Sequence, residues 1–559
     1  MTTPKWWTDA VCYQVYPRSF ADGNGDGIGD LLGIIEKLDY LQWLGVTVIW
    51  ISPFFPSPQF DVGYDISNYH DIDPDYGTLA DFDRLIAEAH KRGIRVLLDL
   101  VLNHTSDQHE WFQQSRLGKN NPYHDWYVWR RGKNGGPPND WESIFGGSAW
   151  EYDETLDQYY YHYFFKEQPD LNWRNPAVTQ RMFDEVRFWL DRGVDGFRLD
   201  AIGAIYEDPD LPDAHVDVGL EELFLNWTMG VSEDTTKQFR AKIRYQDDLP
   251  ENHSLMKALR ELIDTYDDRI LLGETDDPRY YGDGTNELHS VFNFDILRFQ
   301  KDENLHANKI RQKLADRAKL LPKGAWECNT VGNHDITRSF TFYGDDRSRH
   351  QVALAMVTLL RGTPVFYYGE EIGMTDYLMQ EIEWFKDNLG VWIYGVLQLK
   401  RQLSPEKAFA FANIMGRDKC RTPMQWRNAP NAGFSPADIT TWLPVNPNYT
   451  EGINVEEQRE NPNSALNYLR RLIQVRQTHE ALRQGELVML DTDDVLSFWR
   501  KTTQQSCFIA LNMSNQPTSL QLEKQVVHQI FSTHLRSSEL DHLTAFKLHP
   551  YEVYIGIQE

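Results

Sequence analysis

Apolar runs that are typical of β-strands alternate along this chain with stretches that are typical of amphipathic helices. Strand-like runs occupy residues 10–16, 46–51 and 94–99, and residues 31–44 and 79–91 between them carry apolar side chains at helical spacing. Strands that alternate with helices predict parallel βα units. In a chain of 559 residues, we expect these units to close into a (β/α)8 TIM barrel, an α/β fold that accommodates long insertions.

Later elements are predicted from helix caps and from the positions where apolar runs end. Thr78 is placed to cap the helix over 79–91, and Asn175 followed by Pro176 opens a helix that we expect to end near Asp191. The fourth, fifth, seventh and eighth strands are expected to end at Asp200, Glu274, about Val331 and Tyr368, and the sixth to lie near 288–294.

Two long stretches and the C-terminal tail break the βα rhythm. Residues 105–172 are rich in Trp, Tyr, Asn, Gly and Pro, which predicts a small inserted domain after strand 3. A second insertion, of about 375–450, follows strand 8. Short alternating runs over residues 485–559 predict an antiparallel C-terminal β-sandwich domain. The barrel is therefore expected to comprise residues 1–104 and 173–484.

Composition narrows the class of ligand. The formal net charge of −27 opposes binding to nucleic acid or to anionic lipid through charge. The aromatic residues are numerous, with 18 Trp, 27 Tyr and 28 Phe; many belong to a packed core, but flat rings also stack on sugar faces. We therefore expect a globular protein with a small-molecule ligand, and the composition weakly favours a carbohydrate as that ligand.

Cysteine content and hydropathy indicate the cellular compartment of the protein. Cys12, Cys328, Cys420 and Cys507 form no CxxC pair, so reduced thiols of a cytosolic protein are expected. The N-terminal segment lacks the apolar stretch of a signal peptide. The longest apolar runs, such as 353–360, are far shorter than the ~20 residues that cross a bilayer. These features predict a cytoplasmic protein with no membrane partner.

Three carboxylates stand at or just past the ends of predicted strands: Asp200, Glu274 and Asp335. The carboxyl ends of barrel strands meet on one face, where the active sites of such barrels lie. Arg198 and His334 are close in sequence to two of these acids. A single acid after a strand means little, but three with these neighbours predict carboxylate chemistry at one site.

Four segments together resemble the α-amylase superfamily, glycoside hydrolase family thirteen, and within it the exo-acting oligo-1,6-glucosidase/α-glucosidase branch. They are Asp99-Leu-Val-Leu-Asn-His104, Gly196-Phe-Arg-Leu-Asp200, Gly273-Glu274 and Val331-Gly-Asn-His-Asp335, in the family's order and each after a predicted strand. The resemblance extends from Gln14-Val-Tyr-Pro-Arg-Ser-Phe20 to Arg421-Thr-Pro-Met-Gln-Trp426, which spans the barrel and its insertions.

The resemblance implies a retaining glycosidase, in which a nucleophilic carboxylate and a proton-donating carboxylic acid lie about 5–5.5 Å apart. Asp200 matches the nucleophile. Glu274 matches the general acid/base, whose pKa should be raised by partial burial and by the charges of Asp200 and Asp335. Asp335 matches the third acid, which grips sugar hydroxyls and favours an oxocarbenium-like ring. Arg198 would hold Asp200 ionised and oriented. The alternative interpretation of Arg198, an ordinary structural ion pair, is compatible with this role.

Three further positions match those that close the sugar pocket in this branch. Tyr64 would stack on the glucose ring. Asp61 and Arg421 would meet the terminal hydroxyls and block chain extension, which makes the enzyme exo-acting.

Two histidines and a phenylalanine complete the predicted pocket. His104 and His334 fit donors to hydroxyls of the same glucose ring, and Phe164 fits a second wall. The alternative interpretations are structural histidines and ordinary packing of Phe164 within the inserted domain.

Oxygen-bearing residues alternate with glycine in Asp22-Gly-Asn24-Gly-Asp26-Gly-Ile28-Gly-Asp30. This spacing lets the backbone curl around a hard cation. It is similar to the start of an EF-hand, but Gly33 stands where the bidentate Glu would be. The family resemblance implies a structural Ca²⁺, or Mg²⁺, held by Asp22, Asn24, Asp26, Asp30 and the carbonyl of Ile28. A Gly/Asp turn without an ion is the alternative.

Together these observations predict an α-glucosidase that releases the terminal non-reducing glucose of short α-glucosides through a covalent glucosyl–Asp200 intermediate. Ala201 favours α-1,4 over α-1,6 linkages, although one small side chain decides only ~1–3 kcal/mol. Trehalose synthase and isomaltulose synthase share the same catalytic residues, so a glucosyl-transferring isomerase stays open. A non-catalytic amylase-like binding protein is disfavoured because all three acids are present.

Residues 376–419, near the expected pocket mouth, have no family interpretation. They could set acceptor specificity or form an oligomer contact, and a monomer and a homodimer are both open. Small α-glucosides and oligosaccharides are the expected partners.

Overall fold

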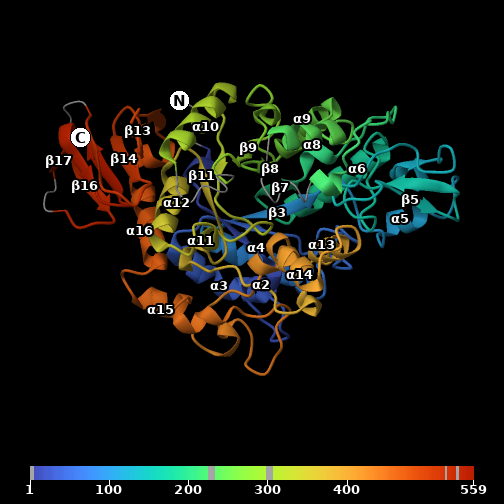
Figure 1. Cartoon of the computed structure of the whole chain (residues 1–559), viewed down its shortest axis with the longest axis horizontal. Helices are drawn as coiled ribbons and strands as arrows, with labels where there is room; N and C mark the ends of the chain where they lie inside the picture. The colour runs from blue at the N-terminus through green and yellow to red at the C-terminus, as the bar shows by residue number, and fades with distance from the viewer. Residues whose placement is uncertain (1–4, 224–232, 298–305, 523–525, 537–539, 559) are drawn as a thin grey trace.

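Eight parallel strands close a barrel in the computed structural model, which describes residues 5–223, 233–297, 306–522, 526–536 and 540–558 (Figure 1). The order around the barrel is β1-β11-β10-β9-β8-β7-β3-β2. The strands are β1 Cys12–Val15, β2 Val48–Ile51, β3 Arg95–Val101, β7 Gly196–Asp200, β8 Ile270–Gly273, β9 Ser290–Asn293, β10 Cys328–Asn329 and β11 Thr363–Tyr367. The predicted barrel is confirmed, including its sixth strand. The seventh strand, β10, is shorter than expected and ends before Val331.

Helices surround the barrel and begin where local capping predicts. Thr78 and Asp81 form a capping box at the start of α4, and the side chain of Asn175 accepts a hydrogen bond from Ala177 N–H at the start of α6. No helix of the described residues is long and apolar enough to span a bilayer. Outside the two insertions, the helices that lie wholly within the described residues are α1 Trp6–Asp9, α2 Pro17–Phe20, α3 Leu31–Leu44, α4 Leu79–Lys91, α6 Pro176–Asp191, α8 Glu233–Ile243, α9 Pro250–Ile263, α10 Ala307–Leu320, α11 Ser339–Phe342, α12 Arg347–Leu359, α15 Val455–Glu460, α16 Ala465–Thr478 and α17 Glu480–Gln484.

The insertion between β3 and β7 folds as a small antiparallel unit, at the right of Figure 1. It contains α5 Glu110–Ser115 and a three-stranded sheet of β4 Trp129–Arg130, β6 Gln158–Tyr161 and β5 Trp150–Asp153. Buried aromatic side chains, among them Trp141, Trp150 and Tyr161, form its core. This confirms the predicted small insert after the third strand.

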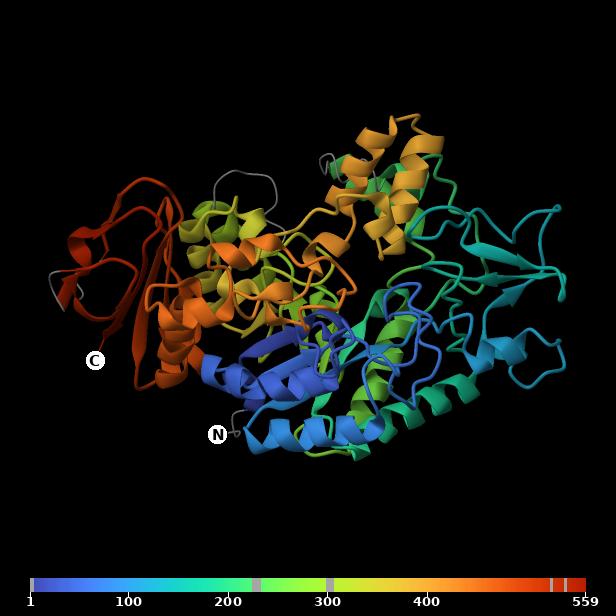
Figure 2. The same ribbon diagram turned by 90° about the horizontal axis from the view of Figure 1, so that it is seen from below.

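The second insertion forms a helical hairpin of α13 Asn388–Leu399 and α14 Pro405–Met415, which stands out from the barrel (Figure 2). The chain ends in an antiparallel six-stranded sheet, β12-β13-β14-β19-β16-β17, with a two-stranded sheet of β15 and β18. These strands are β12 Glu486–Met489, β13 Val495–Lys501, β14 Ser506–Asn512, β15 Thr518–Leu520, β16 Val526–Ser532, β17 Leu540–His542, β18 Phe546–Leu548 and β19 Val553–Gln558.

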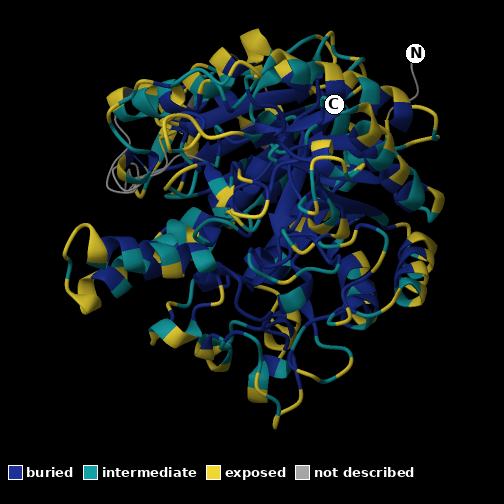
Figure 3. Ribbon diagram, turned by 90° about the vertical axis from the view of Figure 1, so that its right-hand side faces the viewer, coloured by how far each residue is buried: buried dark blue, intermediate teal, exposed yellow. Residues whose placement is uncertain are grey.

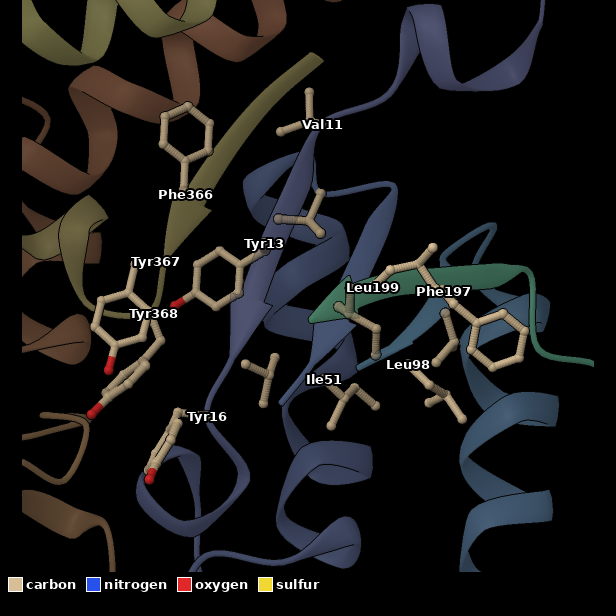
Figure 4. Close-up of a cluster of buried hydrophobic side chains, with 14 of the residues drawn as sticks. Val11, Tyr13, Tyr16, Ile51, Leu98, Phe197, Leu199, Phe366, Tyr367 and Tyr368 are labelled. Atoms are coloured by element: carbon tan, nitrogen blue, oxygen red, sulfur yellow. The ribbon is translucent and has the colours of Figure 1, made fainter. Parts of the chain in front are cut away.

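Alternation along the barrel strands decides which side chains face the barrel interior. The strands are buried on both faces, as the dark blue centre of Figure 3 shows. Phe197 and Leu199 of β7 belong to the large apolar cluster that also contains helical residues (Figure 4). Arg198 and Asp200 therefore lie on the opposite, inner face, where the ring of Trp50 is 5.0 Å from the Arg198 guanidinium.

Glycine substitutions in two helices provide a test of the packing. A Cβ at Gly33, in the first turn of α3, would lie 2.0 Å from the carbonyl oxygen of Ala21, whereas a Cβ at Gly395 in α13 has nothing within 4 Å. Helix propensity alone favours alanine at both positions by about 0.5–1 kcal/mol. We expect Gly395→Ala to raise the melting temperature and Gly33→Ala to lower it. Equal stabilisation of both variants would contradict the close approach at Gly33.

Candidate active site

A cavity of about 560 Å³ opens at the carboxyl ends of the barrel strands. Asp200 is the last residue of β7, Glu274 directly follows β8, and Asp335 lies in the loop after β10. All three line the cavity, so the structure brings together the carboxylates that the sequence singles out. Four other predicted positions line it as well: Asp61, Tyr64, His104 and Phe164. The remaining three, Arg198, His334 and Arg421, contact lining side chains.

The guanidinium of Arg198 joins Asp200 to Glu274. Its Nη1 lies 2.6 Å from Asp200 Oδ1, and its Nη2 lies 2.7 Å from Glu274 Oε1. Nη1 also lies 2.8 Å from Asp99 Oδ1. Arg198 is only 2% exposed, so these contacts are largely shielded from water. Two carboxyl groups are thereby held close together by the two terminal nitrogens of one side chain, and two groups that act on one glycosidic bond must be close together.

Burial raises the pKa of both carboxyl groups. It raises the pKa of Asp200 to about 7, with Arg198 opposing the rise and Asp99 adding to it. It raises the pKa of Glu274 to about 7, and the charges of Asp200 and Asp335 act in the same direction against Arg198. One guanidinium cannot neutralise three carboxylates, so this group retains a proton near neutral pH and titrates as a unit. A retained proton suits a general acid, and an ionised partner suits a nucleophile.

The backbone after Asp200 holds the other oxygen of Glu274. Ala201 N–H donates to Glu274 Oε2 over 3.0 Å. Ala201 has a left-handed conformation, with φ 42° and ψ 45°. Two independent links, through Arg198 and through Ala201, therefore orient Glu274 relative to Asp200.

Asp335 has a different electrostatic environment. Its Oδ1 lies 2.8 Å from Arg421 Nη2 and 3.5 Å from Arg417 Nη1, and its Oδ2 lies 3.3 Å from His334 Nε2. Burial alone would raise its pKa, but the positive charges of Arg417 and Arg421 outweigh burial and hold the pKa of Asp335 well below its ordinary value. Burial lowers the pKa of His334 to about 3, so that ring is neutral and the arginines supply the positive charge. Asp335 is ionised at working pH.

The two predicted histidines are neutral and engaged with protein groups. His334 Nε2 is 2.7 Å from the hydroxyl of Tyr64, and the two rings stack 5.4 Å apart. His104 Nε2 is 3.0 Å from the carbonyl of Tyr64 and 2.9 Å from Gln168 Nε2. Burial lowers the pKa of His104 to about 4. Both histidines thus support Tyr64 from different sides, and their predicted contacts to sugar stay predictions.

Arg417, which the sequence reasoning missed, lies beside Asp61 at the cavity. Arg417 Nη2 lies 2.6 Å from Asp61 Oδ1, and Arg417 lines the cavity. Arg421 is fully buried, is absent from the lining, and contacts Asp335 and the carbonyl of His334. Arg417 is therefore the arginine partner of Asp61, whereas Arg421 supports Asp335. The expected contact of Arg421 with the terminal hydroxyls of a sugar stays a prediction.

A buried carboxylate in the second insertion fixes Arg417. Asp387 is 0% exposed and receives both Nε and Nη2 of Arg417, at 3.0 and 2.7 Å. Asp387 also caps α13 by accepting a hydrogen bond from Leu389 N–H. An Asp just before a helix whose apolar residues start at Leu389 is a recognisable cap signal, but the pattern does not reveal the second role of Asp387 as the partner of Arg417.

Phe164 lies in the cavity wall, as the resemblance implies. Its ring meets that of His104 edge-on at 5.2 Å and lies 5.8 Å from that of Phe145, another lining residue. Gln168, from the same insertion, donates to Asp61 Oδ2 over 3.1 Å. The inserted domain therefore supplies part of the wall and helps to hold Asp61.

The predicted cation loop is tightly curled, but its carboxylates bind backbone amides. Asp22 accepts hydrogen bonds from the N–H groups of Gly25 and Gly27, and Asp30 accepts from those of Gly23, Asn24 and Gly33. The donor set is all oxygen, which suits Ca²⁺ or Mg²⁺. Within the described part of the chain, no three His, Cys, Asp or Glu side chains are arranged to hold a metal ion. The cation therefore stays a prediction.

A family model and two similar proteins match most of this chain. Residues 14–485 match the family described as alpha amylase, catalytic domain. An oligo-1,6-glucosidase of Parageobacillus thermoglucosidasius is 39% identical over 573 residues, 98% of each chain. An α-glucosidase of Pediococcus pentosaceus is 40% identical over 513 residues, 88% of each chain.

Solved structures show the same extent of similarity. A mutant isomaltulose synthase of Erwinia rhapontici NX5, in complex with its natural substrate sucrose, matches with a TM-score of 0.88 and 37% identity over 100% of both chains. The trehalulose synthase of Pseudomonas mesoacidophila MX-45 matches with a TM-score of 0.87 and 35% identity, again over 100% of both chains.

Stability should depend on pH through Glu274. Its folded-state pKa of about 7 exceeds the ordinary 4.5, so the folded protein binds more protons than the unfolded chain between these values. The contribution of Glu274 to stability is therefore present below pH 4.5 and is lost as the pH rises through 7. Gln keeps the shape without this loss. We expect the stability of Glu274→Gln relative to wild type to increase between pH 5 and pH 8. The increase should be on the order of 2 kcal/mol, which is less than the full pKa shift would give, because solvent reaches the quarter of the side chain that is exposed.

Melting temperatures of both proteins at pH 5 and pH 8 test this expectation. Glu154→Gln, an exposed substitution in the inserted domain, is the control and should give the same difference from wild type at both pH values. A Glu274→Gln protein whose relative stability falls as the pH rises would contradict the raised pKa.

Proposed function

We propose a reaction for this chain from one premise: it belongs to the α-amylase family, glycoside hydrolase family thirteen, within the oligo-1,6-glucosidase/α-glucosidase branch. It is a glycoside hydrolase. The proposed activity is retaining hydrolysis of the terminal non-reducing α-linked glucose of short α-glucosides. One observation carries the proposal: Asp200 and Glu274 share the guanidinium of Arg198 at the wall of a sugar-sized cavity.

Two displacements complete the proposed reaction. In the first, an oxygen of Asp200 bonds to the anomeric carbon as the bond to the leaving oxygen breaks, and Glu274 gives its proton to that oxygen. In the second, Glu274 takes a proton from water, the water oxygen bonds to the anomeric carbon, and the ester to Asp200 breaks. Two inversions retain the α configuration. The lowered pKa of Asp335 keeps a negative charge beside the ring as positive charge develops on it.

The pair of Asp61 and Arg417 supports exo action. Both side chains line the cavity and are linked over 2.6 Å, and each is 5–8% exposed. In the proposed complex this pair meets the hydroxyls of the terminal glucose and leaves no room for a further sugar at that end.

The linkage preference is the finer part of the proposal. Ala201 lines the cavity next to the nucleophile, and its small side chain favours α-1,4 over α-1,6 bonds. The name of the Parageobacillus relative, oligo-1,6-glucosidase, favours the opposite order. Pocket contacts of this size decide only ~1–3 kcal/mol, so both linkages are expected to be cleaved, with maltose preferred.

A glucosyl-transferring isomerase is the second candidate. The whole-chain match to isomaltulose and trehalulose synthases favours it. Trehalose synthase, which shares the catalytic residues, is an enzyme of the same kind: it would form the same intermediate and return glucose to the released sugar. A non-catalytic binding protein is disfavoured, since all three carboxylates face the cavity.

Product analysis by proton NMR tests the proposed reaction with maltose, isomaltose, sucrose, trehalose and maltotriose. We expect free glucose as the main product, released first as the α anomer, and a higher kcat/KM for maltose than for isomaltose. A rearranged disaccharide as the main product from sucrose or maltose would favour the isomerase. β-Glucose released first would contradict retention.

We also propose that Asp22, Asn24, Asp26, Asp30 and the carbonyl of Ile28 hold one structural Ca²⁺. The left-handed conformations of Gly25 and Gly27, with φ 84° and 95°, support a loop curled around an ion. The ion would stabilise the loop and takes no part in the displacements.

Buried, unpaired cysteines at all four positions support a cytoplasmic location.

Calcium should raise the melting temperature of protein that has been treated with a chelator, because a ligand that binds only the folded state stabilises that state. The stabilisation is about 2.7 kcal/mol when the free ligand is at a hundred times its Kd. Asp26→Ala should remove this response, and Asp210→Ala, an exposed control, should keep it. Identical melting temperatures with chelator and with millimolar Ca²⁺ would count against the ion, and a response to Mg²⁺ alone would reassign it.

A further inference from the structure

One short loop, residues 57–65, carries two of the side chains that line the cavity, and its backbone is strained. Asp61 and Tyr64 are the two lining residues. Gln59 and Val62 of the same loop have positive φ, of 64° and 46°. Glycine adopts such angles freely, but a β-branched residue such as Val62 does so rarely and at a cost. A conformation of this kind persists only where surrounding contacts hold it.

Asp65 supplies three of these contacts through one carboxyl group. Its Oδ1 accepts hydrogen bonds from Ser57 Oγ over 2.8 Å and from Asp61 N–H over 3.0 Å. Its Oδ2 accepts one from Phe60 N–H over 2.8 Å. All three donors precede Val62 in the chain, and Asp65 follows it. The carboxyl group therefore joins the two sides of the strained turn.

Asp65 depends on these donors as much as the loop depends on Asp65. The residue is 0% exposed, and no Lys, Arg or His side chain of the described residues forms an ion pair with it. Burial raises the pKa of Asp65, and the three hydrogen bonds oppose that rise. A buried carboxyl group without a cation needs such partners, so the loop and Asp65 hold each other in one arrangement.

The position of this loop decides how both insertions meet the barrel. Asp61 Oδ1 lies 2.6 Å from Arg417 Nη2, and Asp61 Oδ2 accepts from Gln168 Nε2 over 3.1 Å. The carbonyl of Phe60 accepts from Asn388 Nδ2 over 2.7 Å. Gln168 belongs to the first insertion, and Asn388 and Arg417 belong to the second. A shift of the loop would therefore alter the wall of the cavity on both sides of Asp61.

We propose that Asp65 is a positioning residue of the active site: its carboxyl group holds the strained turn at Val62 and thereby places Asp61 against Arg417 at the cavity. Asp65 does not line the cavity, so it acts only through the groups that it holds. The proposal rests on the α-glucosidase reaction proposed above, in which Asp61 meets the terminal hydroxyls of glucose.

Substitution of Asp65 in two backgrounds tests the proposal. Asp65→Asn keeps the shape of the side chain, but whichever way the amide is turned, its NH2 group faces the N–H of Phe60 or of Asp61. We expect kcat/KM for maltose to fall about ten- to a hundredfold, as for a displaced binding group, and the Kd of glucose, measured by titration calorimetry, to rise. In Asp61→Ala, which has no carboxylate to place, Asp65→Asn should change kcat/KM by less than about twofold.

Asp153→Asn is the matched control. Asp153 is 3% exposed and accepts hydrogen bonds from the N–H groups of Thr155 and Leu156 in the inserted domain, and it is absent from the cavity lining. Both Asp65→Asn and Asp153→Asn should lower the melting temperature, because each leaves a buried N–H group without its acceptor. Only Asp65→Asn should change kcat/KM for maltose and the Kd of glucose.

Val62→Gly tests the part that strain plays, because glycine adopts a positive φ without cost. Added to Asp65→Asn, it should restore part of the lost kcat/KM, since the turn then has no strain to relax. A folded double variant that regains no activity would overturn the strained turn as the link between Asp65 and Asp61.

The outcomes separate this proposal from the one on which it rests. Equal losses of kcat/KM from Asp65→Asn in wild type and in Asp61→Ala would show a general structural role and overturn the positioning of Asp61. If wild type released glucose from none of the five test sugars, while Asp65→Asn still weakened glucose binding, the hydrolytic reaction would be overturned and the positioning would stand. A wild-type protein that neither binds nor releases glucose would overturn both.

Discussion

The active site depends on one buried positive charge, the guanidinium of Arg198, which three carboxylates share. It sets the relative positions of Asp200 and Glu274 and limits how much negative charge the site can hold. Its planar fork binds separate carboxylates through different nitrogens, which a lysine ammonium would not reproduce. Removing one partner from such a buried ionic group is costly, by about 3–5 kcal/mol, because the remaining charges stay buried without compensation. The raised pKa values of Asp200 and Glu274 follow from the same shortage of positive charge.

The barrel makes this arrangement through strand register. Asp99 of β3 pairs directly with Arg198 of β7, and side chains two apart on a strand point the same way, which brings Asp200 to the same inner face. A shift of one residue would turn these side chains toward the helices. The insertions then complete the pocket: the first contributes Phe164 and Gln168, and the second contributes Arg417. The strands position the reactive side chains, and the insertions form the boundary of the pocket.

Features with a local cause could be predicted from the sequence. The helices α4 and α6 begin where Thr78 and Asn175 cap them, because a cap acts within one helical turn. The three acids were identifiable because each stands at or after the end of a strand in a recognisable segment. Arg417 and Arg421 are only four residues apart, and nothing in their spacing shows which of them faces Asp61. That choice depends on Asp387, thirty residues away, a contact created by the tertiary fold. The strand β10 is limited to Cys328 and Asn329, the two residues that pair with β9 and with β11.

The most direct test of the account is to trap the intermediate. A fluorinated glucosyl fluoride that forms the glucosyl ester faster than water removes it should label the protein once, and mass spectrometry of its peptides should place the label on Asp200. Asp200→Asn should remain folded and unlabelled. A label on Glu274 or Asp335, or maltose turnover by Asp200→Asn near the wild-type rate, would contradict the assignment of Asp200 as the group that bonds to the sugar.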